Sequence, residues 1–327
     1  MRYNERFIQI LGQMAQQTTA RGEHFKAQAY RKAQETIQKF GIKNLEELKG
    51  MPGIGKSILE VLSNADRDPF MGNQKVAEDP HILFIGIYGI GPKKAAELVE
   101  SGIKTIEKLR ELQNDVLNDK QIIGLKYYED VLKRIPRNEI HQYNKVINSS
   151  MFRILCRNKF EQEDAELEIV GSFRRGASDS GDIDVIITAK FPQIFALLID
   201  DMIKNGVILE VLSRGSSKCL VMAKIPGASV VRRVDFLYSP PDEYAFSILY
   251  FTGSKEFNTA MRTRALEFGL TLNEHGFHHM VEGVNGRKVK GEKVDQLFKD
   301  EKEIFDHLRM IWKEPHERKD GSSIITY

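Results

Sequence analysis

Two acidic residues open an apolar, β-branched run in the middle of the chain, and this run constrains the fold more than any other feature. It reads Asp182-Ile-Asp184-Val-Ile-Ile-Thr188. Side chains at positions i and i+2 of a strand point to the same face, so the two carboxylates are expected side by side. Adjacent like charges are costly without a cation, and hard divalent cations prefer oxygen ligands. The run therefore predicts a buried strand that begins at a divalent-metal site.

A glycine-serine motif and a third carboxylate extend this interpretation. The segment Gly171–Arg175 reads GSFRR and lies shortly before Gly181, while Asp235 lies within a second β-branched run, Val230–Tyr238. The Ser172 hydroxyl and the Gly181 N–H can bind phosphate oxygens, and Arg175 supplies positive charge. A buried acid needs a partner, which a shared metal ion would provide. An isolated pair of aspartates is usually an ordinary strand end, but this combination predicts nucleotidyl transfer with two metal ions.

The order of the expected elements indicates an α+β protein of several domains. The 327 residues exceed the roughly 100–200 that are typical of one domain. About the first 150 residues are expected to form helices separated by glycine turns, and strand-like runs begin only near residue 166. The expected strands are Leu167–Val170, Ile183–Thr188, Val207–Leu212, Leu220–Ile225 and Val230–Tyr238, with a helix at Phe191–Lys204. Later helices are expected at Glu243–Tyr250, Glu256–Phe268 and Glu301–Trp312, around a glycine-rich region of short strands. A helical domain followed by a mixed α/β domain fits this order.

An internal repeat predicts two phosphate-binding units in the helical part. Residues 50–56 and 88–94 both place Gly-Ile-Gly before a helix-like run, and their flanks, IKNLEEL (42–48) and IKTIEKL (103–109), agree. Glycines permit a tight hairpin that brings backbone N–H groups to a phosphate, and the following helix adds its positive N-terminus. A single copy would be an ordinary helix connection, but two matching copies predict helix-hairpin-helix motifs. Such contacts hold DNA without reading its sequence.

Composition and charge are compatible with an intracellular protein that binds nucleic acid. Residues 1–150 hold 23 Lys and Arg against 19 Asp and Glu, a weak positive excess in the front half. Cys156 and Cys219 provide neither a disulfide framework nor a zinc site. No apolar run reaches the roughly 18 residues of a membrane helix, and no secretory signal is expected.

Taken together, these segments resemble the family X DNA polymerases, and the resemblance covers nearly the whole chain. It is carried by Ala29-Tyr-Arg-Lys-Ala33, both Gly-Ile-Gly hairpins, Ile123-Gly-Leu-Lys-Tyr127, Lys133-Arg-Ile-Pro-Arg137, GSFRRGASDSGDIDV (171–185), RRVDF (232–236) and Leu249-Tyr-Phe-Thr-Gly-Ser254. The resemblance implies a helical, lyase-like DNA-binding domain over 1–77, a fingers-type subdomain over 78–135, a nucleotidyltransferase palm over 136–240 and a small α/β thumb-type subdomain over 241–327. The activity it implies is template-directed DNA synthesis into short gaps during base excision repair.

The same resemblance implies roles for individual residues. Asp182, Asp184 and Asp235 match three aspartates that bind two Mg²⁺ (or Mn²⁺) ions, with Asp235 nearest the primer 3′-hydroxyl. Residues that match contacts to the incoming nucleotide are Arg134, Ser172, Arg175, Gly181, Tyr250, Phe251, Gly253 and Asn258. Residues that match DNA contacts are Lys26, Tyr30, Gly53, Gly55, Lys56, Gly89, Gly91, Lys93, Arg233 and Arg262. The carbonyls of Lys49, Met51, Ile54, Ile85, Ile87 and Ile90 fall where the family binds a monovalent cation, Na⁺ or K⁺.

One departure from the family concerns a second activity. Repair members carry a lysine in the helix after the first hairpin, which attacks the 5′-deoxyribose phosphate to form a Schiff base. Val61 occupies this position and cannot form an imine, and Ser57 replaces another lysine that is common in the family. The sequence therefore argues against lyase activity, although the domain can still bind the 5′ side of a gap.

The resemblance also implies partners, and two alternatives remain beside it. The implied partners are gapped or nicked duplex DNA and deoxynucleoside triphosphates, bound by a monomer without membrane contact. The implied location is the nucleus, or a cytoplasmic site of DNA replication if the protein is viral. A terminal transferase is the weaker enzyme alternative, because the hairpin at Ser213–Lys218 is short where template-independent relatives carry a long loop. The other alternative is a DNA-end-binding module with vestigial catalysis, against which the three aspartates argue.

Overall fold

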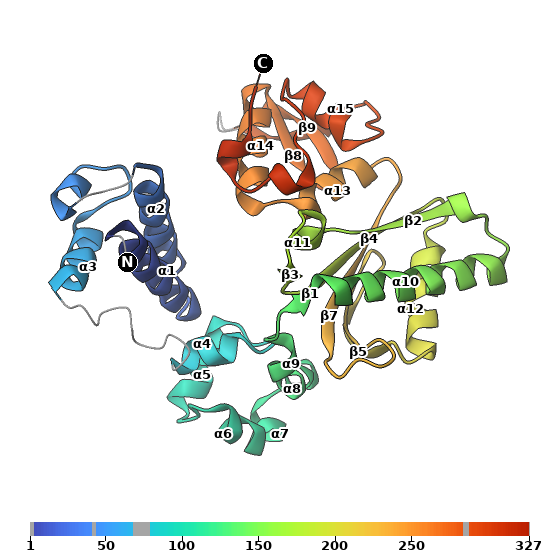
Figure 1. The fold of residues 1–327 in the computed structure, drawn as a ribbon, viewed down its shortest axis with the longest axis horizontal. Helices are drawn as coiled ribbons and strands as arrows, with labels where there is room; N and C mark the ends of the chain where they lie inside the picture. The colour runs from blue at the N-terminus through green and yellow to red at the C-terminus, as the bar shows by residue number, and fades with distance from the viewer. Residues whose placement is uncertain (1–2, 41–43, 68–78, 284–287, 327) are drawn as a thin grey trace. The chain divides into compact units, whose positions relative to one another are not determined.

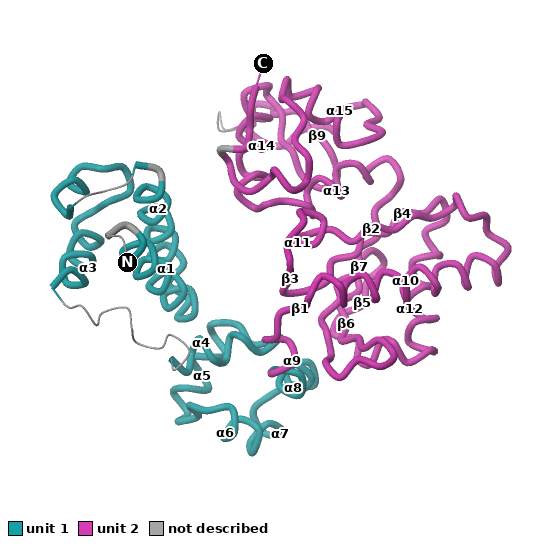
Figure 2. Tube along the Cα trace, in the orientation of Figure 1, with its two compact units in different colours: residues 1–128 teal, residues 129–327 magenta. Residues whose placement is uncertain are grey.

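The structure is a computed structural model that describes residues 3–40, 44–67, 79–283 and 288–326. Figure 1 shows its helices and strands. The chain divides into two compact units, residues 1–128 and 129–327 (Figure 2), and each is described by itself. The described part of the first unit is helical, whereas the second contains the sheets, which confirms the α+β class with the helical part first.

The first part of unit one is a small helical bundle. Its elements are α1 (Tyr3–Ala20), α2 (His24–Phe40), a 3₁₀ turn (Leu45–Leu48) and α3 (Lys56–Arg67). Phe7, Ile10 and Leu11 on one face of α1 are almost completely buried. The core of this bundle contains Phe7, Ile10, Leu11, Ala15, Tyr30, Ala33, Ile37, Leu48, Ile54, Ile58, Leu62 and Ala65. The apolar faces of all three helices therefore meet in one core.

Both Gly-Ile-Gly hairpins fold in the same way. The turns are Met51–Ile54 and Ile87–Ile90, and in each the N–H of the last residue donates to the carbonyl of the first at 3.1 Å. The third residue is a glycine with a positive φ, +81° at Gly53 and +84° at Gly89, as a type II turn requires. Helix α3 follows the first turn and α5 (Pro92–Glu100) the second, at the same spacing. The hairpin followed by a helix is thus a repeat in the structure. The similar flanks are not equivalent, because residues 44–48 precede the first hairpin whereas residues 103–109 follow α5. Residues 41–43 lie outside the described part.

The remaining helices of unit one surround a second apolar core. They are α4 (Pro80–Ile85), α5, α6 (Ile106–Glu111), α7 (Gln113–Val116) and α8 (Asp119–Lys126). Helix α8 starts with a capping box formed by Asn118 and Gln121. It packs directly on the second hairpin, because a Cβ atom at Gly124 would lie 2.3 Å from the Tyr88 carbonyl oxygen. Helix α8 therefore packs against the backbone of the second hairpin.

A five-stranded mixed sheet forms the centre of unit two. Its strands are β2 (Ala165–Ile169), β4 (Ile183–Ala189), β5 (Ile208–Arg214), β6 (Lys218–Ala223) and β7 (Arg232–Ser239), in the order β2-β4-β7-β6-β5. In this sheet β4 and β7 are parallel and the other neighbours are antiparallel. All five predicted strands are confirmed, with ends that differ by at most two residues.

The helices of this unit are α9 (Tyr128–Val131), α10 (Arg137–Asn158), α11 (Gly171–Arg174), α12 (Gln193–Lys204), α13 (Tyr244–Thr252), α14 (Lys255–Glu267) and α15 (Glu301–His307).

Alternation along β4 decides which face of the sheet carries each side chain. Val185 and Ile187 belong to the large core shared with α10 and α12 (Figure 1), whereas Ile186 packs with α13. Asp184 has the parity of Ile186, so its carboxylate lies on the face of α13.

The last part of unit two is a small α/β assembly. Its antiparallel sheet has the order β10-β9-β8, with β8 (Leu270–Asn273), β9 (Gly276–Glu282) and β10 (Lys288–Lys293). The helix predicted over Glu301–Trp312 is too long and ends at His307. The chain reverses at Arg309, whose φ is +51°, and Met310 then pairs with Thr326 in an antiparallel bridge. This reversal brings the C-terminal segment back onto the assembly.

No helix in the described ranges is both long and apolar enough to cross a membrane. Cys156 is exposed and Cys219 is buried, and both are free thiols.

Candidate active site

Three predicted aspartates meet where two parallel strands begin. In the register of β4 and β7, Asp184 lies opposite Asp235. Asp182 precedes β4 by one residue, and strand alternation places it on the same face as Asp184. Asp235 is only 7% exposed. The fold thus brings together carboxylates from two segments that are far apart in the sequence.

Gly171 provides the space that Asp184 occupies. It begins α11 with a φ of +63°, and a Cβ atom at this residue would lie 2.9 Å from Asp184 Oδ2. Both the backbone conformation and this close approach favour glycine. Val170, which directly follows β2, also contacts Asp184, because its N–H donates to the Asp184 carbonyl oxygen at 2.9 Å. The glycine-serine motif therefore packs directly against the carboxylates.

Burial and mutual repulsion act on these carboxylates together. Burial, followed by the charges of Asp182 and Asp235, raises the pKa of Asp184 to about 7. Burial also raises the pKa of Asp235, which Arg233 lowers and Asp182 raises further. A cation bound among the three groups would offset both the lost hydration and the repulsion. The three side chains therefore form one electrostatic site.

Arg233 compensates part of this negative charge. It forms an ion pair with Asp182, and its Nε lies 3.4 Å from Asp235 Oδ1. Asp235 Oδ1 is nevertheless buried without a hydrogen-bond partner. With the side chains in these positions, no three acidic, histidine or cysteine side chains within the described ranges form a ready metal-binding cluster. A buried, unsatisfied carboxylate oxygen beside two further carboxylates is nonetheless the oxygen donor set that Mg²⁺ and Mn²⁺ prefer, so these residues fit a divalent cation.

A short ladder holds the predicted phosphate-binding loop. β3 (Asp179–Ser180) pairs antiparallel with β1 (Ile135–Pro136), and Ser172 donates to the Ser180 hydroxyl oxygen at 2.7 Å. β1 lies well before residue 166, where the first strand was expected. That expectation was wrong for β1, because a two-residue strand has no periodicity to detect. Arg134 directly precedes β1, and it lies beside Gly181, which follows β3.

Arg137 supports the same loop and was missed from the sequence. It donates to the carbonyl oxygens of Phe173 (2.5 Å) and Ala177 (3.3 Å), and its guanidinium lies 4.1 Å from the centre of the Phe173 ring. Arg137 ends the segment Lys133-Arg-Ile-Pro-Arg137, which carried part of the resemblance. No spacing rule, however, links an arginine at this position to a loop 36 residues later. Arg137 therefore helps to fix the conformation of the loop by bonding two of its carbonyl oxygens.

The predicted nucleotide contacts of the C-terminal part lie on α13 and α14. Arg175 donates to the Thr252 carbonyl oxygen at 2.6 Å, and a Cβ atom at Gly253 would lie 3.4 Å from Arg175. Ser254 then caps α14 by accepting the Phe257 N–H. Arg175 and Gly253 are thus neighbours in space, as their shared assignment to the nucleotide requires.

Tyr250, Asn258 and Arg262 form a second group beside it. The Asn258 amide donates to the Tyr250 carbonyl oxygen at 2.6 Å, and Arg262 lies 5.1 Å from the centre of the Tyr250 ring. Phe251 meets Tyr250 edge-on, with ring centres 5.0 Å apart. Tyr250, Asn258 and Arg262 line a small cavity together with Phe246, Leu249, Met261, Leu272 and Asn273. The structure therefore gathers the four side chains that were assigned to the nucleotide sugar and the base pair.

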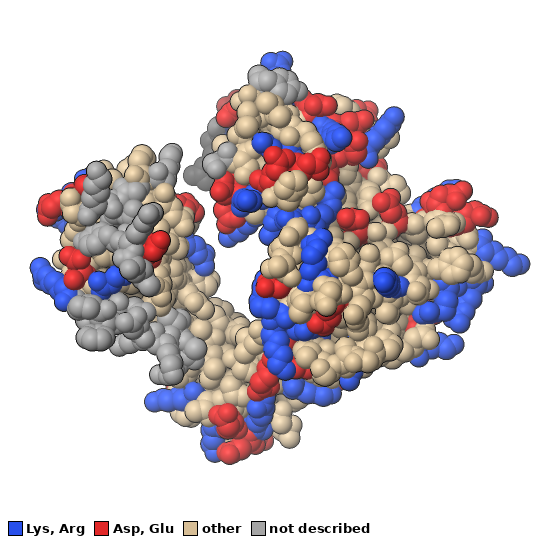
Figure 3. Space-filling view, viewed as in Figure 1, with Lys and Arg blue, Asp and Glu red and all other residues tan. Residues whose placement is uncertain are grey.

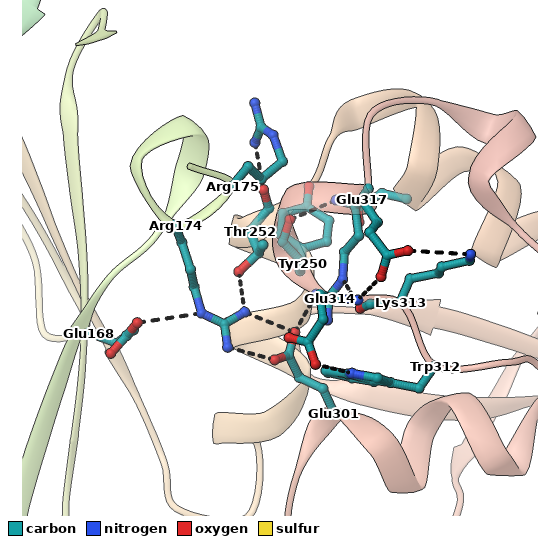
Figure 4. Close-up of polar contacts among 12 residues, drawn as sticks. Glu168, Arg174, Arg175, Tyr250, Thr252, Glu301, Trp312, Lys313, Glu314 and Glu317 are labelled. Atoms are coloured by element: carbon teal, nitrogen blue, oxygen red, sulfur yellow. Dashed lines mark hydrogen bonds and ion pairs between the residues drawn. The ribbon is translucent and has the colours of Figure 1, made fainter. Parts of the chain in front are cut away.

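A buried charge network behind this group was also missed from the sequence. Arg174 contacts the Thr252 hydroxyl (2.9 Å), Glu301 (2.7 Å) and Glu168 (3.4 Å), as Figure 4 shows. Glu301 also accepts from Arg318 at 2.5 Å, and Arg318 is completely buried. The network joins α11 and α15 to the end of α13. It therefore fixes the position of Thr252 relative to the loop that carries Arg175.

The predicted DNA contacts of the first hairpin line a groove of about 560 Å³. Its walls are Lys26, Ala29, Tyr30, Gly53, Ile54, Gly55, Lys56, Ser57 and Ile58. Lys26 forms an ion pair with Glu23 (2.8 Å) and Lys49 with Glu46 (2.5 Å). Val61 instead packs against the core of the bundle, so the residue at the family's lysine position does not line this groove.

The second hairpin presents similar groups. A Cβ atom at Gly91 would meet nothing within 4 Å, and Lys93 is exposed. The carbonyls of Met51 and Ile87 close the two turns. Of the other residues whose carbonyls were assigned to monovalent cations, Lys49 and Ile85 precede these turns, and Ile54 and Ile90 end them. The two hairpins thus offer equivalent open backbone surfaces.

The charge distribution of unit two agrees with an anionic ligand at the site. On the face shown in Figure 3, Lys and Arg side chains form a strip over the positions of α11, β3 and β1. These are the elements that carry the predicted triphosphate contacts. A strip of positive charge next to buried carboxylates suits a ligand that combines phosphates with divalent cations.

Four families match successive parts of the chain. Residues 2–65 match a helix-hairpin-helix domain, 82–132 the fingers domain of DNA polymerase lambda, 134–241 the DNA polymerase beta palm, and 247–319 the DNA polymerase beta thumb. The order of the four matches is the order of the parts described above. Each part of the structure therefore has a counterpart among known domains.

The chain is also similar to other proteins along most of its length. It is 29% identical to DNA polymerase lambda of Arabidopsis thaliana over 96% of the chain and 62% of the relative. It is 30% identical to DNA polymerase lambda of Rattus norvegicus over 97% and 56%. It is 24% identical to DNA nucleotidylexotransferase of Ambystoma mexicanum over 85% and 61%. The chain thus spans about three fifths of the length of these relatives.

Proposed function

Since the chain belongs to family X of the DNA polymerases, we propose that it is a DNA-directed DNA polymerase that fills short gaps by nucleotidyl transfer. Its substrates are gapped or nicked duplex DNA and deoxynucleoside triphosphates, which it binds as a monomer. The observation that carries this proposal is the register of β4 and β7, which sets Asp184 opposite Asp235 beside Asp182 and Gly171. The setting is base excision repair, in the nucleus or at a cytoplasmic site of viral DNA replication.

The mechanism follows from the groups that meet at this register. Asp182, Asp184 and Asp235 would hold two Mg²⁺ (or Mn²⁺) ions, which when bound activate the primer 3′-hydroxyl and neutralise charge on the triphosphate. Asp235 lies nearest the primer terminus in this assignment. The 3′-hydroxyl gives up its proton to solvent, its oxygen forms a bond to the α-phosphorus, and pyrophosphate leaves with the electrons of the broken P–O bond.

The remaining assigned residues orient the substrates. Arg134, Ser172, Arg175 and Gly181 bind the triphosphate through charged and neutral N–H and O–H donors. The turn at Gly253, with Tyr250 and Phe251, leaves little room for a ribose 2′-hydroxyl. Asn258 and Arg262 contact the minor-groove edge of the new base pair, and Arg233 contacts the primer. The contacts of Arg175 with Thr252 and of Asn258 with Tyr250 support these assignments.

The two hairpins serve to hold the DNA backbone on either side of the gap. The N–H groups at Gly53, Gly55, Gly89 and Gly91, with Lys56 and Lys93, bind phosphates. The carbonyls of Lys49, Met51, Ile54, Ile85, Ile87 and Ile90 would hold a Na⁺ or K⁺ ion, which would supply further positive charge toward the DNA backbone. Lys26 and Tyr30 extend this surface in the groove of unit one. Such contacts are ionic, so affinity should fall steeply with salt and be independent of sequence.

A single gap-filling assay separates this function from its alternatives. On a duplex with a one-nucleotide gap and Mg²⁺, we expect incorporation of the nucleotide complementary to the template base. The turn between β5 and β6 spans only residues 215–217, which supports template direction. Untemplated extension of a single-stranded primer at equal rate would instead indicate a terminal transferase. Gap binding without any incorporation would indicate a DNA-end-binding module.

We expect the protein to form no Schiff base with a 5′-deoxyribose phosphate. Val61 packs against the core and cannot form an imine, and the hydrogen bond and charge of Glu23 raise the pKa of Lys26, which disfavours the neutral, nucleophilic amine. The measurement is borohydride trapping on a one-nucleotide gap that carries this group. The matched variant is Val61→Lys, which should gain an adduct. An adduct on the unmodified chain, mapped to Lys26, Lys49 or Lys56, would show that another lysine has taken over the reaction.

A further inference from the structure

Arg134 is exposed, yet Asp179 holds its guanidinium in a defined position. The side chains are 60% and 46% exposed, and Arg134 Nη2 lies 2.6 Å from Asp179 Oδ1. Nε donates to the same oxygen at 2.8 Å, and Nη2 donates to the Asp179 carbonyl oxygen at 3.2 Å. Three contacts from one residue fix both the direction and the rotation of the guanidinium, which a single surface ion pair does not do.

The ladder of β1 and β3 explains why these two residues meet. Pro136 pairs with Asp179 and Ile135 with Ser180, so continuing the antiparallel register sets Arg134 opposite Gly181. The side chain agrees with this register, since a Cβ atom at Gly181 would lie 3.2 Å from Arg134 Nη1. Asp179 therefore engages the Nε and Nη2 side of the guanidinium, while Nη1 lies over Gly181.

We propose that Asp179 is a positioning residue that orders Arg134 for the triphosphate of the incoming nucleotide. This inference rests on the proposed function, in which Arg134, Ser172 and Gly181 bind that triphosphate. Asp179 uses N–H groups on one side of the guanidinium and leaves Nη1 on the side of Gly181. The triphosphate then meets an arginine whose rotamers are already fixed, and preorganisation of this kind increases affinity.

The test compares two variants that separate position from charge. Asp179→Ala removes both the contacts and the charge, whereas Asp179→Asn keeps an oxygen that can accept from Nε and Nη2. Dissociation constants for the templated deoxynucleoside triphosphate are measured with Mg²⁺ on gapped DNA whose primer ends in a dideoxynucleotide, so no turnover occurs. We expect Asp179→Ala to weaken binding about fivefold and Asp179→Asn to stay within about twofold of the unmodified protein. In primer extension, Asp179→Ala should raise KM with kcat nearly unchanged.

Two controls make the outcome decisive. Asp200→Ala removes a comparable surface pair, with Arg214 at 2.7 Å, and should leave nucleotide binding unchanged. In an Arg134→Ala background, Asp179→Ala should have no further effect, because the two residues act as one unit. Tighter binding by both Asp179 variants would overturn the inference in favour of charge competition, and unchanged binding by Asp179→Ala would overturn it outright. Absence of nucleotide binding by the unmodified protein would overturn the proposed function as well.

Discussion

Asp235→Ala is expected to lower the rate of nucleotide incorporation on gapped DNA by about 10³-fold or more. Asp235 is the one carboxylate of the site that β7 supplies, and its buried Oδ1 has no hydrogen-bond partner among the described residues. Without it, nothing from β7 can help to bind the cation that activates the primer hydroxyl. The measurement is single-turnover extension of a gapped duplex at saturating nucleotide and Mg²⁺.

Two properties should survive in this variant. Binding to gapped DNA should change little, because the hairpins of unit one supply most of the backbone contacts in the proposed function. Stability at pH 7 should not fall, because burial raises the pKa of Asp235 above its unfolded value. A raised carboxyl pKa stabilises the fold below the unfolded pKa, and this contribution is lost as the pH rises through the folded pKa. Near-normal incorporation by a folded Asp235→Ala protein would refute the active-site assignment.

The strands and the aspartate trio were predictable because their signals are local and redundant. The run from Asp182 to Thr188 combines β-branched residues with acids at i and i+2, and the structure places this run in β4. The two Gly-Ile-Gly turns were predictable for a different reason. A type II turn requires a positive φ at its third residue, and glycine supplies it in both copies. Each of these features is decided by neighbours within a few positions.

The contacts that hold the site together were not predictable in the same way. Glu301 lies 127 residues from Arg174, and no periodic pattern connects them. Asp179 reads in the sequence as an ordinary loop acid, and only the pairing of two very short strands brings it to Arg134. Helix α15 ends at His307, shortly before the chain reverses at Arg309 and Met310 pairs with Thr326, which again joins distant residues. Local sequence therefore predicts the reacting groups, whereas the residues that position them depend on tertiary structure.

Glu301→Ala is expected to destabilise the C-terminal part by about 3–5 kcal/mol. Glu301 is 6% exposed and accepts from both Arg174 and Arg318, and Arg318 is completely buried. Removing the carboxylate leaves a buried guanidinium without its ion-pair partner, which costs far more than the pair itself contributes. The measurement is denaturant unfolding followed by the fluorescence of Trp312, which is the single tryptophan and lies 4.8 Å from Arg318.

Two comparisons separate the buried charge from a general effect of losing a glutamate. Glu267→Ala breaks the exposed pair with Arg264 on α14 and should cost about 0.5 kcal/mol or less. The double replacement Glu301→Leu with Arg318→Met should recover most of the stability lost in Glu301→Ala, because no unpaired charge then remains among Phe257, Phe305 and Trp312.

The doubly replaced protein would still lack the contact that joins Arg174 to α15 beside Thr252. Its KM for nucleotide should therefore stay raised after its stability returns, which would distinguish the network's role in positioning from its role in folding. A loss of less than about 1 kcal/mol in Glu301→Ala would contradict this account of the network.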